Sequence, residues 1–199
     1  MSRNDEKSYT VHKDKKELLF ADVQGEVLEI GPGTGVNFTF LKDKDIRWSG
    51  IEPNPAMHPH LYKAADLHGM AVNLLDCKIG EICLPDNSMD AVISTEVMCS
   101  VHDLDKCLHE IRRVLKPGSK FLFLEHVVDK NNFARRTTQK AMPYTPWRIF
   151  AEGCRPARDI GKAIEKSGFS NVEYTNYMQE GSGIITSITR PHIVGYAIK

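Results

Sequence analysis

Residues 27–38, VLEIGPGTGVNF, decide the fold, because a short apolar run leads there directly into a glycine-rich turn. Gly31, Gly33 and Gly35 tolerate positive φ angles and let another group approach the backbone without a Cβ in the way. A strand followed by such a turn predicts either a plain tight connection to a helix or the floor of a ligand site. The rest of the chain decides between the two.

Short β-rich runs alternate with helical patterns along the chain. Strands are predicted at 26–30, 46–53, 70–76, 89–97, 120–128, 171–178 and 192–199, and helices at 34–43, 55–69, 103–118 and 158–169. This alternation predicts a parallel sheet covered by helices on both faces. The last two strands are expected to form a hairpin, with GSGIITSITRP between them as a turn plus a short strand.

The composition is that of an ordinary globular protein. The 199 residues include 26 basic and 26 acidic side chains, and this neutrality argues against nucleic acid as the main partner. No apolar run is long enough for a transmembrane segment, and the charged N-terminus does not resemble a signal peptide. A cytoplasmic protein is expected.

One domain is expected over residues 21–199, preceded by a polar lead-in over 1–20. The segment 129–155 mixes aromatic residues, prolines and basic residues and has no strand pattern. It is predicted to be a helical insertion that forms a lid over the substrate.

No metal site is predicted from the spacing of potential ligands. The five cysteines are dispersed, with gaps of six between Cys77 and Cys83 and eight between Cys99 and Cys107, unlike a metal-binding knuckle. His58 and His60 are badly spaced for one helix face. The cysteines are expected to be reduced and mostly buried.

A carboxylate at the end of the second predicted strand favours the ligand-site interpretation of the glycine turn. Glu52 follows the turn by about twenty residues, and an acid in this place can accept hydrogen bonds from both hydroxyls of a ribose. The glycine order, Gly-x-Gly-x-Gly, differs from the Gly-x-Gly-x-x-Gly of dinucleotide-binding proteins. A nicotinamide oxidoreductase is therefore a weaker alternative.

These motifs, with LPDNSMDAVIS and HEIRRVLKPGSKFLFLEH, make the chain similar to class I S-adenosylmethionine-dependent methyltransferases from residue 26 onward. The resemblance implies a Rossmann-like three-layer sandwich of the α/β class. Its seven-stranded sheet would be mostly parallel, with the last strand antiparallel. The cofactor would be S-adenosyl-L-methionine.

A narrower resemblance comes from TEVMCSVHD, FLEHV, PWRIFAEGC and RPHIVGYAIK. These stretches are similar to the methyltransferase-like group that includes the animal thiol S-methyltransferases. The animal proteins carry an apolar N-terminal membrane segment, which has no counterpart in the first 20 residues here. The resemblance implies a small-molecule acceptor.

The resemblance also implies roles for particular residues. Glu29 would lie near the amino-acid part of the cofactor. The glycine turn would lie beneath its methionine and ribose, and Glu52 would bind the ribose hydroxyls. The expected cofactor-binding residues are Glu29, Gly31, Pro32, Gly33, Gly35, Glu52, Pro53, Asn54, Ile79, Gly80, Thr95, Glu96 and Val97. Asp76 and Cys77 are the alternative to Ile79 and Gly80 beside the adenine.

A thiol is the favoured acceptor because it ionises cheaply. Deprotonation at pH 7 costs about 2 kcal/mol for a thiol and about 4.6 kcal/mol for an amine. His126 and Glu96 are the predicted catalytic residues, with Glu125, His102 and His192 as further candidates for the base. His126, Tyr144, Trp147 and Phe150 are expected to bind the substrate.

Two other functions remain open at this point. Related folds methylate a carbon or nitrogen of quinone-like or lipid-headgroup acceptors. A protein that keeps the cofactor pocket without turnover would instead be a non-catalytic S-adenosylmethionine-binding scaffold.

Overall fold

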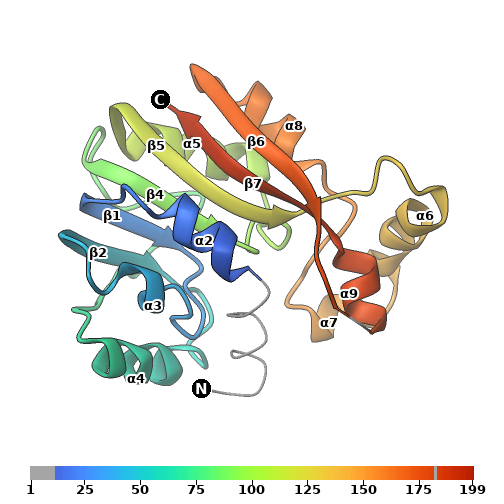
Figure 1. The fold of residues 1–199 in the computed structure, drawn as a ribbon, viewed down its shortest axis with the longest axis horizontal. Coiled ribbons are helices and arrows are strands. Elements are labelled where there is room, and N and C mark those ends of the chain that lie inside the picture. Colours follow the sequence, from blue (N-terminus) through green and yellow to red (C-terminus); the bar gives the residue numbers. More distant parts are fainter. Residues whose placement is uncertain (1–11, 182) are drawn as a thin grey trace.

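Seven strands form one sheet in the computed structural model, which describes residues 12–181 and 183–199. They are β1 (Gly25–Ile30), β2 (Ile46–Ile51), β3 (Asn73–Leu74), β4 (Met89–Thr95), β5 (Leu115–His126), β6 (Asn171–Met178) and β7 (Pro191–Ile198). Their order is β3-β2-β1-β4-β5-β7-β6 (Figure 1). All pairings from β3 to β5 are parallel, and β7 is antiparallel to both its neighbours. The predicted sheet and its C-terminal hairpin are confirmed.

Both faces of the sheet are buried, because apolar residues alternate between two core clusters. In β1, Leu28 and Ile30 belong to one cluster and Val27 to the other. Phe121 and Leu122 in β5 divide in the same way. Successive side chains of a strand point to opposite faces, so strands this apolar need a layer of helices on each side.

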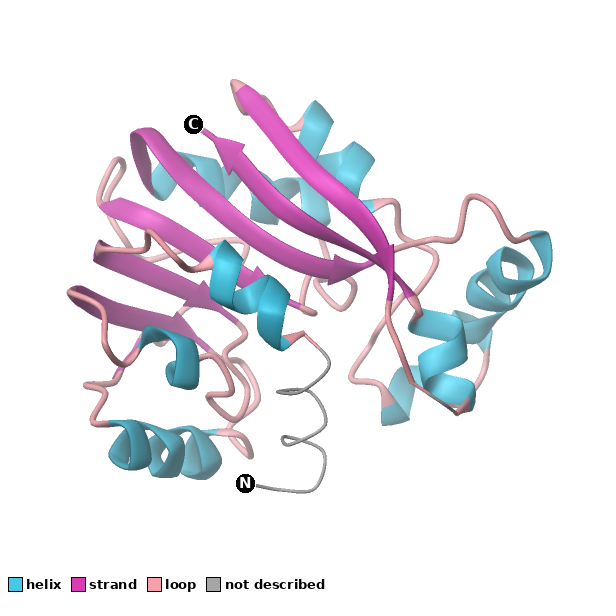
Figure 2. Cartoon of the chain, in the orientation of Figure 1, coloured by secondary structure: helices cyan, strands magenta, loops and turns pink. Residues whose placement is uncertain are grey.

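The helices supply those two layers. Residues of α3 (Phe38–Leu41) and α4 (His58–His68) pack into one cluster, and α5 (Leu104–Val114) and α8 (Ile160–Lys166) into the other. Figure 1 shows α2 (Lys13–Leu19) in front of the sheet, on the side of α3, with α5 and α8 behind. The remaining helices gather beyond the ends of β5 and β7 (Figure 2). These are α6 (Phe133–Ala141), η1 (Met142–Tyr144), α7 (Trp147–Phe150) and α9 (Ile184–Thr189).

The predicted lead-in over 1–20 extends too far into the chain. Residues 13–19 form α2, and His12, Lys16 and Phe20 are buried. The polar composition of this segment did not indicate a helix that buries Lys16 or a buried histidine, His12, directly before it. Residues 1–11 of the predicted lead-in lie outside the described residues.

Three predicted elements are shorter than expected. The helix predicted at 34–43 is reduced to α3 because the turn over 31–37 precedes it, and the strand at 70–76 is reduced to β3. The helix at 103–118 ends at Val114, and Pro117 and Gly118 lie within β5 instead of ending the helix. Gly118 has φ = 79°, and the pairing of β4 with β5 shifts register beside it.

The strand expected between β6 and β7 is wrong, because residues 184–189 form α9. This helix packs against α6, and Arg135 and Gln139 of α6 donate hydrogen bonds to the carbonyls of Ser187 and Ile188. These tertiary contacts outweigh the strand preference of the β-branched residues in IITSIT.

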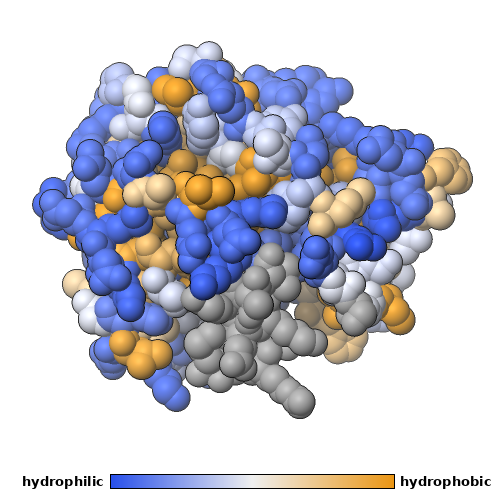
Figure 3. Space-filling view, viewed as in Figure 1, coloured by the Kyte–Doolittle hydropathy of each residue, from blue (hydrophilic) through white to orange (hydrophobic). Residues whose placement is uncertain are grey.

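The start of segment 129–155 is organised around Asp129. Its buried carboxylate accepts hydrogen bonds from the backbone N–H groups of Asn131 and Asn132 and pairs with Arg135. Several large apolar side chains of this region are exposed: Phe133, Tyr144, Ile149, Phe150, Ile184 and Ile185. Elsewhere the visible face is mainly hydrophilic (Figure 3). Within 12–181 and 183–199, no helix has the length and apolar character to cross a bilayer.

Candidate active site

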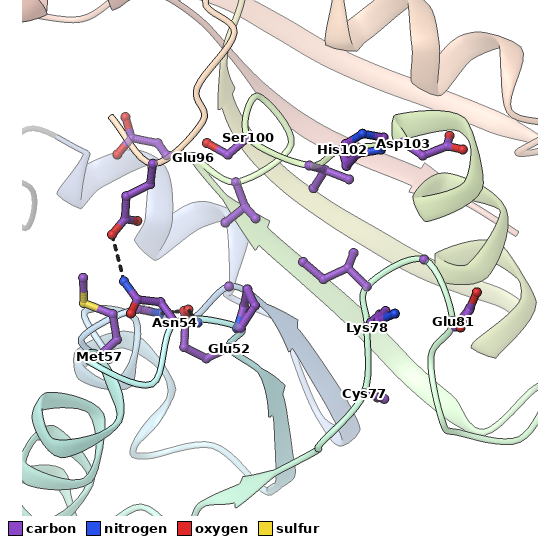
Figure 4. Close-up of a pocket in the computed structure, with 18 of the residues that line it drawn as sticks. Glu52, Asn54, Met57, Cys77, Lys78, Glu81, Glu96, Ser100, His102 and Asp103 are labelled. Atoms are coloured by element: carbon purple, nitrogen blue, oxygen red, sulfur yellow. Dashed lines mark hydrogen bonds between the residues drawn. The ribbon is translucent and has the colours of Figure 1, made fainter. Parts of the chain in front are cut away.

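A cavity of about 920 Å³ lies at the carboxyl ends of β1, β2 and β4. Open α/β sheets bind their ligands at this edge, beside the point where the strand order reverses. The cavity is lined by Gly31 and Gly33 and by residues of the segments 52–57, 77–81 and 95–103 (Figure 4), with Lys106 and Glu152 completing it. Its volume is at the upper end of the range for small-molecule sites.

The three glycines of the turn have different tasks, although each has a positive φ. A Cβ on Gly31 would lie 2.7 Å from a methyl group of Val97, and one on Gly35 would lie 3.0 Å from Leu61 and Ala64. A Cβ on Gly33 would meet nothing within 4 Å. Gly31 and Gly35 therefore allow close packing of the protein, and Gly33 leaves space within the cavity. Gly35 and Pro32, predicted to contact the cofactor, are absent from the cavity lining.

Glu52 is held in place at the end of β2. One carboxylate oxygen accepts the N–H of Gly33 at 2.8 Å, and the other accepts the N–H of Asn54 at 2.9 Å. These bonds tie the acid to the glycine turn and leave further acceptor positions on both oxygens. The side chain of Asn54 donates to Glu152 at 2.9 Å, which links the far side of the cavity to β2 (Figure 4).

Glu29 does not line the cavity, contrary to its predicted place beside the cofactor. Its buried carboxylate accepts hydrogen bonds from Asn37 at 2.7 Å and from the indole N–H of Trp48 at 2.8 Å. Burial raises the pKa of Glu29, and these two bonds oppose the rise. Side chains alternate between the two faces of β1, and Glu29 lies on the same face as Val27, toward α3. Through its bond to Asn37 it supports the glycine turn from the protein interior.

The loop after β3 contributes one whole residue pair, and one member of the other, of the two pairs that the sequence left open. Ile79 and Gly80 line the cavity, and so does Cys77, but Asp76 does not. Figure 4 shows this loop as the wall opposite Asn54 and Met57.

The carboxylate of Glu125, which does not line the cavity, organises the loop after β4. Glu125 of β5 is fully buried and accepts hydrogen bonds from Ser94 Oγ and from the backbone N–H groups of Val97 and Met98. Burial raises the pKa of Glu125 to about 7. Thr95, Glu96 and Val97 thereby form a fixed wall of the cavity.

Glu96 stands at this wall with a strained backbone, φ = 59°. Its carboxylate lies 3.3 Å from Nε2 of His192 and 4.0 Å from Nε2 of His12, and Tyr177 bonds to Nδ1 of His12. Burial would raise the pKa of Glu96, but the hydrogen bond from His192 and the nearby His12 lower it to about 2. Burial also lowers the pKa of His12 to about 4.

His126, which is predicted to contact substrate, is buried and absent from the cavity lining. Its Nε2 lies 3.3 Å from Sγ of Cys154. Of the five candidate proton acceptors, only Glu96 and His102 line the cavity; Glu125, His126 and His192 lie behind its wall.

The three aromatic residues predicted to bind substrate do not line the cavity either. Tyr144 and Phe150 are 92% and 84% exposed, and Trp147 packs against the core cluster that contains Cys154. Aromatic composition indicated an apolar pocket here, but these helices turn two of the three rings outward.

The cavity carries an excess of negative charge. Its lining includes five carboxylates, Glu52, Glu81, Glu96, Asp103 and Glu152, and two lysines, Lys78 and Lys106. Lys106 pairs with Glu81 at 2.6 Å, and Asp103 caps α5 by accepting the N–H of Lys106. The remaining carboxylates favour a ligand with positive charge.

Residues far apart in sequence complete the site, and the motif analysis missed them. Glu152 lines the cavity from the segment after α7. His12, directly before α2, and Lys16 of α2 lie near Glu96 but outside the lining. Burial lowers the pKa of Lys16, against the attraction of Glu96 and Glu29. In the sequence, only the polar character of the α2 segment and the single acid in FAEGC indicate that these residues could belong to the site.

A family model described as a methyltransferase domain matches residues 28–123. The chain is 32% identical to thiol S-methyltransferase TMT1A of Homo sapiens, over 93% of this chain and 78% of that protein. It is 33% identical to thiol S-methyltransferase TMT1B of Rattus norvegicus, over 97% and 82%. The chain belongs to the class I S-adenosylmethionine-dependent methyltransferases.

A solved structure shares the fold of this methyltransferase at low identity. The geranyl diphosphate C-methyltransferase from Streptomyces coelicolor A3(2) superposes with a TM-score of 0.75 at 12% identity, covering 96% of this chain and 77% of that one. The architecture is therefore kept where the sequence has diverged almost completely.

S-adenosyl-L-methionine is the cofactor of this methyltransferase, and the cavity fits it. The open space at Gly33 admits a ligand against the backbone, Glu52 has free acceptor positions for ribose hydroxyls, and the carboxylate excess suits a sulfonium cation.

Proposed function

We propose that this methyltransferase transfers a methyl group to the thiol of a small molecule. The observation that carries the proposal is the 32–33% identity to two thiol S-methyltransferases over 93–97% of the chain. The similarity covers about four-fifths of each relative, so it extends well beyond residues 28–123 that match the methyltransferase-domain model.

In this proposal, Glu52 holds the ribose, the open face of Gly33 admits the cofactor to the backbone, and Ile79 and Gly80 lie beside the adenine. Thr95, Glu96 and Val97 form the wall on the acceptor side. When bound, S-adenosylmethionine supplies a methyl group on a positively charged sulfur. The task of the chain is to hold both partners in line and to exclude water.

The groups on the cavity wall suit an acceptor that loses its proton easily. Glu96 and His102 are the two candidate proton acceptors that line the cavity. An acceptor thiol costs only about 2 kcal/mol to ionise at pH 7, so it needs little more than a nearby proton acceptor. Because its pKa is lowered to about 2, Glu96 is a poor proton acceptor, and we favour His102 for this role. An unactivated amine would need more help, and its protonated form would be held by the surrounding carboxylates.

The test is methyl transfer from labelled S-adenosylmethionine to matched acceptors. Aliphatic and aromatic thiols are compared with the alcohols and amines of the same shape and with a quinol, each by the purified wild-type chain. Label is expected on the thiols alone. A labelled quinol with unlabelled thiols would establish a quinone-like acceptor instead, and cofactor binding with no transfer to any acceptor would indicate a scaffold.

Glu96→Gln and His102→Gln test which wall residue takes the proton. The variant that lacks the proton acceptor should have a lower kcat with thiols of high pKa. It should retain the wild-type kcat with thiols that are already ionised at the assay pH. Equal losses with both classes of thiol would remove that residue from proton transfer.

A further inference from the structure

Three potential metal ligands meet behind the cavity wall, at a place that their spacing in sequence does not indicate. They are Cys99 in the loop after β4, His126 at the end of β5 and Cys154 after α7. Their ligand atoms all lie within 4.8 Å of one another, and Sγ of Cys154 is 3.3 Å from Nε2 of His126. The three residues are only 3–6% exposed.

The backbone holds these ligands in place from both sides. The carbonyl of Cys99 accepts the N–H of Arg155 at 3.0 Å, and the guanidinium of Arg158 donates to the carbonyl of Met98 at 2.7 Å. His126 is paired with His192 in the ladder between β5 and β7. The side chains are therefore brought together by the fold and need no large movement to share an ion.

The chemistry of the set matches zinc. Two thiolates and an imidazole are typical Zn²⁺ ligands, and tetrahedral coordination places such atoms about 3.5 to 3.8 Å apart. Among the described residues, the imidazole of His126 has only thiols as hydrogen-bonding neighbours: Sγ of Cys154 lies near Nε2, and Nδ1 has no partner. Free thiols satisfy a buried imidazole poorly, because sulfur is a weak hydrogen-bonding group.

We propose that Cys99, His126 and Cys154 bind one zinc ion, which fastens the segment after α7 to the loop after β4. These residues supply three ligands, and water or another small ligand takes the fourth position. The site is separate from the proposed methyl transfer, because none of its three residues lines the cavity.

A zinc ion here would brace two walls of the cofactor cavity. Ser100, which follows Cys99, lines the cavity, as does Glu152, which is two residues before Cys154 and bonds to Asn54. Removal of the ion is expected to loosen Glu152 and thereby to lower stability and weaken cofactor binding. The fold of the sheet does not depend on it.

The first experiment measures zinc in the wild-type chain, purified from zinc-supplemented cells without chelators. About one zinc per chain is expected. Cys154→Ala should reduce this by about tenfold, whereas Cys107→Ala should keep it. Cys107 is a matched control, because it is buried to the same degree and lies outside the cluster.

Cobalt substitution of the wild type gives an answer even if Cys154→Ala fails to fold. Thiolate-to-cobalt charge-transfer bands and strong tetrahedral d–d bands are expected, and zinc should abolish them. Zinc-free wild-type protein without such bands would overturn the proposal. So would a Cys99–Cys154 disulfide found by thiol titration and mass spectrometry, or an equal loss of zinc in Cys107→Ala.

Discussion

At the scale of single residues, the site depends on a few groups whose surroundings give them different tasks. Glu29 and Glu52 are both carboxylates at the ends of neighbouring strands. Glu29 is enclosed by Asn37 and Trp48, whereas Glu52 is fixed by two backbone N–H groups and faces the cavity. Position relative to the sheet edge, and not residue type, makes one structural and the other a ligand-binding group.

Glu52→Gln is expected to weaken binding of S-adenosylhomocysteine by about tenfold to a hundredfold. Hydrogen bonds from ribose hydroxyls to a charged acceptor contribute about 1.5 to 3 kcal/mol each, and the amide loses the charge. Isothermal titration calorimetry measures the change. Glu81→Gln is the control, because Glu81 lines the same cavity but is exposed and paired with Lys106. Equal affinities of the two variants would show that Glu52 is the wrong carboxylate.

Gly33→Ala is expected to lower both stability and cofactor affinity, whereas Gly118→Ala lowers stability alone. Both glycines have positive φ and no atom within 4 Å of an added Cβ, so the backbone penalty is similar, about 1 to 2 kcal/mol. Only Gly33 lines the cavity, where a methyl group would occupy ligand space and cost about tenfold in affinity. Urea unfolding and calorimetry separate the two effects. Unchanged affinity in the Gly33 variant would place the ligand away from the turn.

At the scale of elements, the C-terminal hairpin shows how closely strands must approach to complete this sheet. Gly195 of β7 is paired with Phe123 of β5 and Tyr174 of β6. His192, near the start of the same strand, contacts Glu96 from behind the cavity wall. The hairpin therefore supports the wall at one end and has a packing requirement in its middle.

Gly195→Ala should destabilise the chain by about 3 kcal/mol, because overpacking forces the strands apart. An added Cβ would lie 2.6 Å from Cα of Tyr174 and closer still to the carbonyl of Glu173. Chemical denaturation gives the change in unfolding free energy. Gly80→Ala is the matched substitution, since its Cβ would make an ordinary contact of 3.4 Å with Lys106. Similar stability of the two variants would mean that β6 and β7 can separate without cost.

At the scale of the whole molecule, the buried carboxylate of Glu125 couples stability to pH. Burial raises its pKa to about 7 from the usual 4.5. Between these pH values the folded chain binds more protons than the unfolded chain, so this group lowers stability as pH rises from 4.5 to 7 and changes nothing further above 7.

Glu125→Gln, which cannot ionise, should remove this effect. The free energy of unfolding of the variant relative to wild type is expected to rise by about 2 to 3 kcal/mol between pH 5 and pH 8. Urea titrations of both proteins at each pH measure the difference, in which other titrating groups cancel. Parallel pH profiles would show that Glu125 ionises normally in the folded chain.

Much of this arrangement could be predicted because it is local. Strand, glycine turn and Glu52 follow one another within about thirty residues, and parallel strands bring their carboxyl ends to one edge whatever the rest of the chain does. The start of α5 beside Asp103 and the end of α4 beside Gly69 depend on neighbours in sequence, and both agree with the predicted helix bounds. The sheet, the family and the cavity floor follow from such patterns.

The other features were decided by contacts between distant segments. Glu152 meets Asn54 across 98 positions, and His12 reaches Glu96 from a segment predicted to be a lead-in. Hydrophobic periodicity reports which face of an element is buried, but it carries no information about which distant polar groups share that burial. The sequence by itself thus determined a methyltransferase fold and its cofactor floor. Only the tertiary structure turned Glu29 inward, enclosed His126 and brought it together with Cys99 and Cys154, because desolvation and pairing at long range depend on the packed chain as a whole.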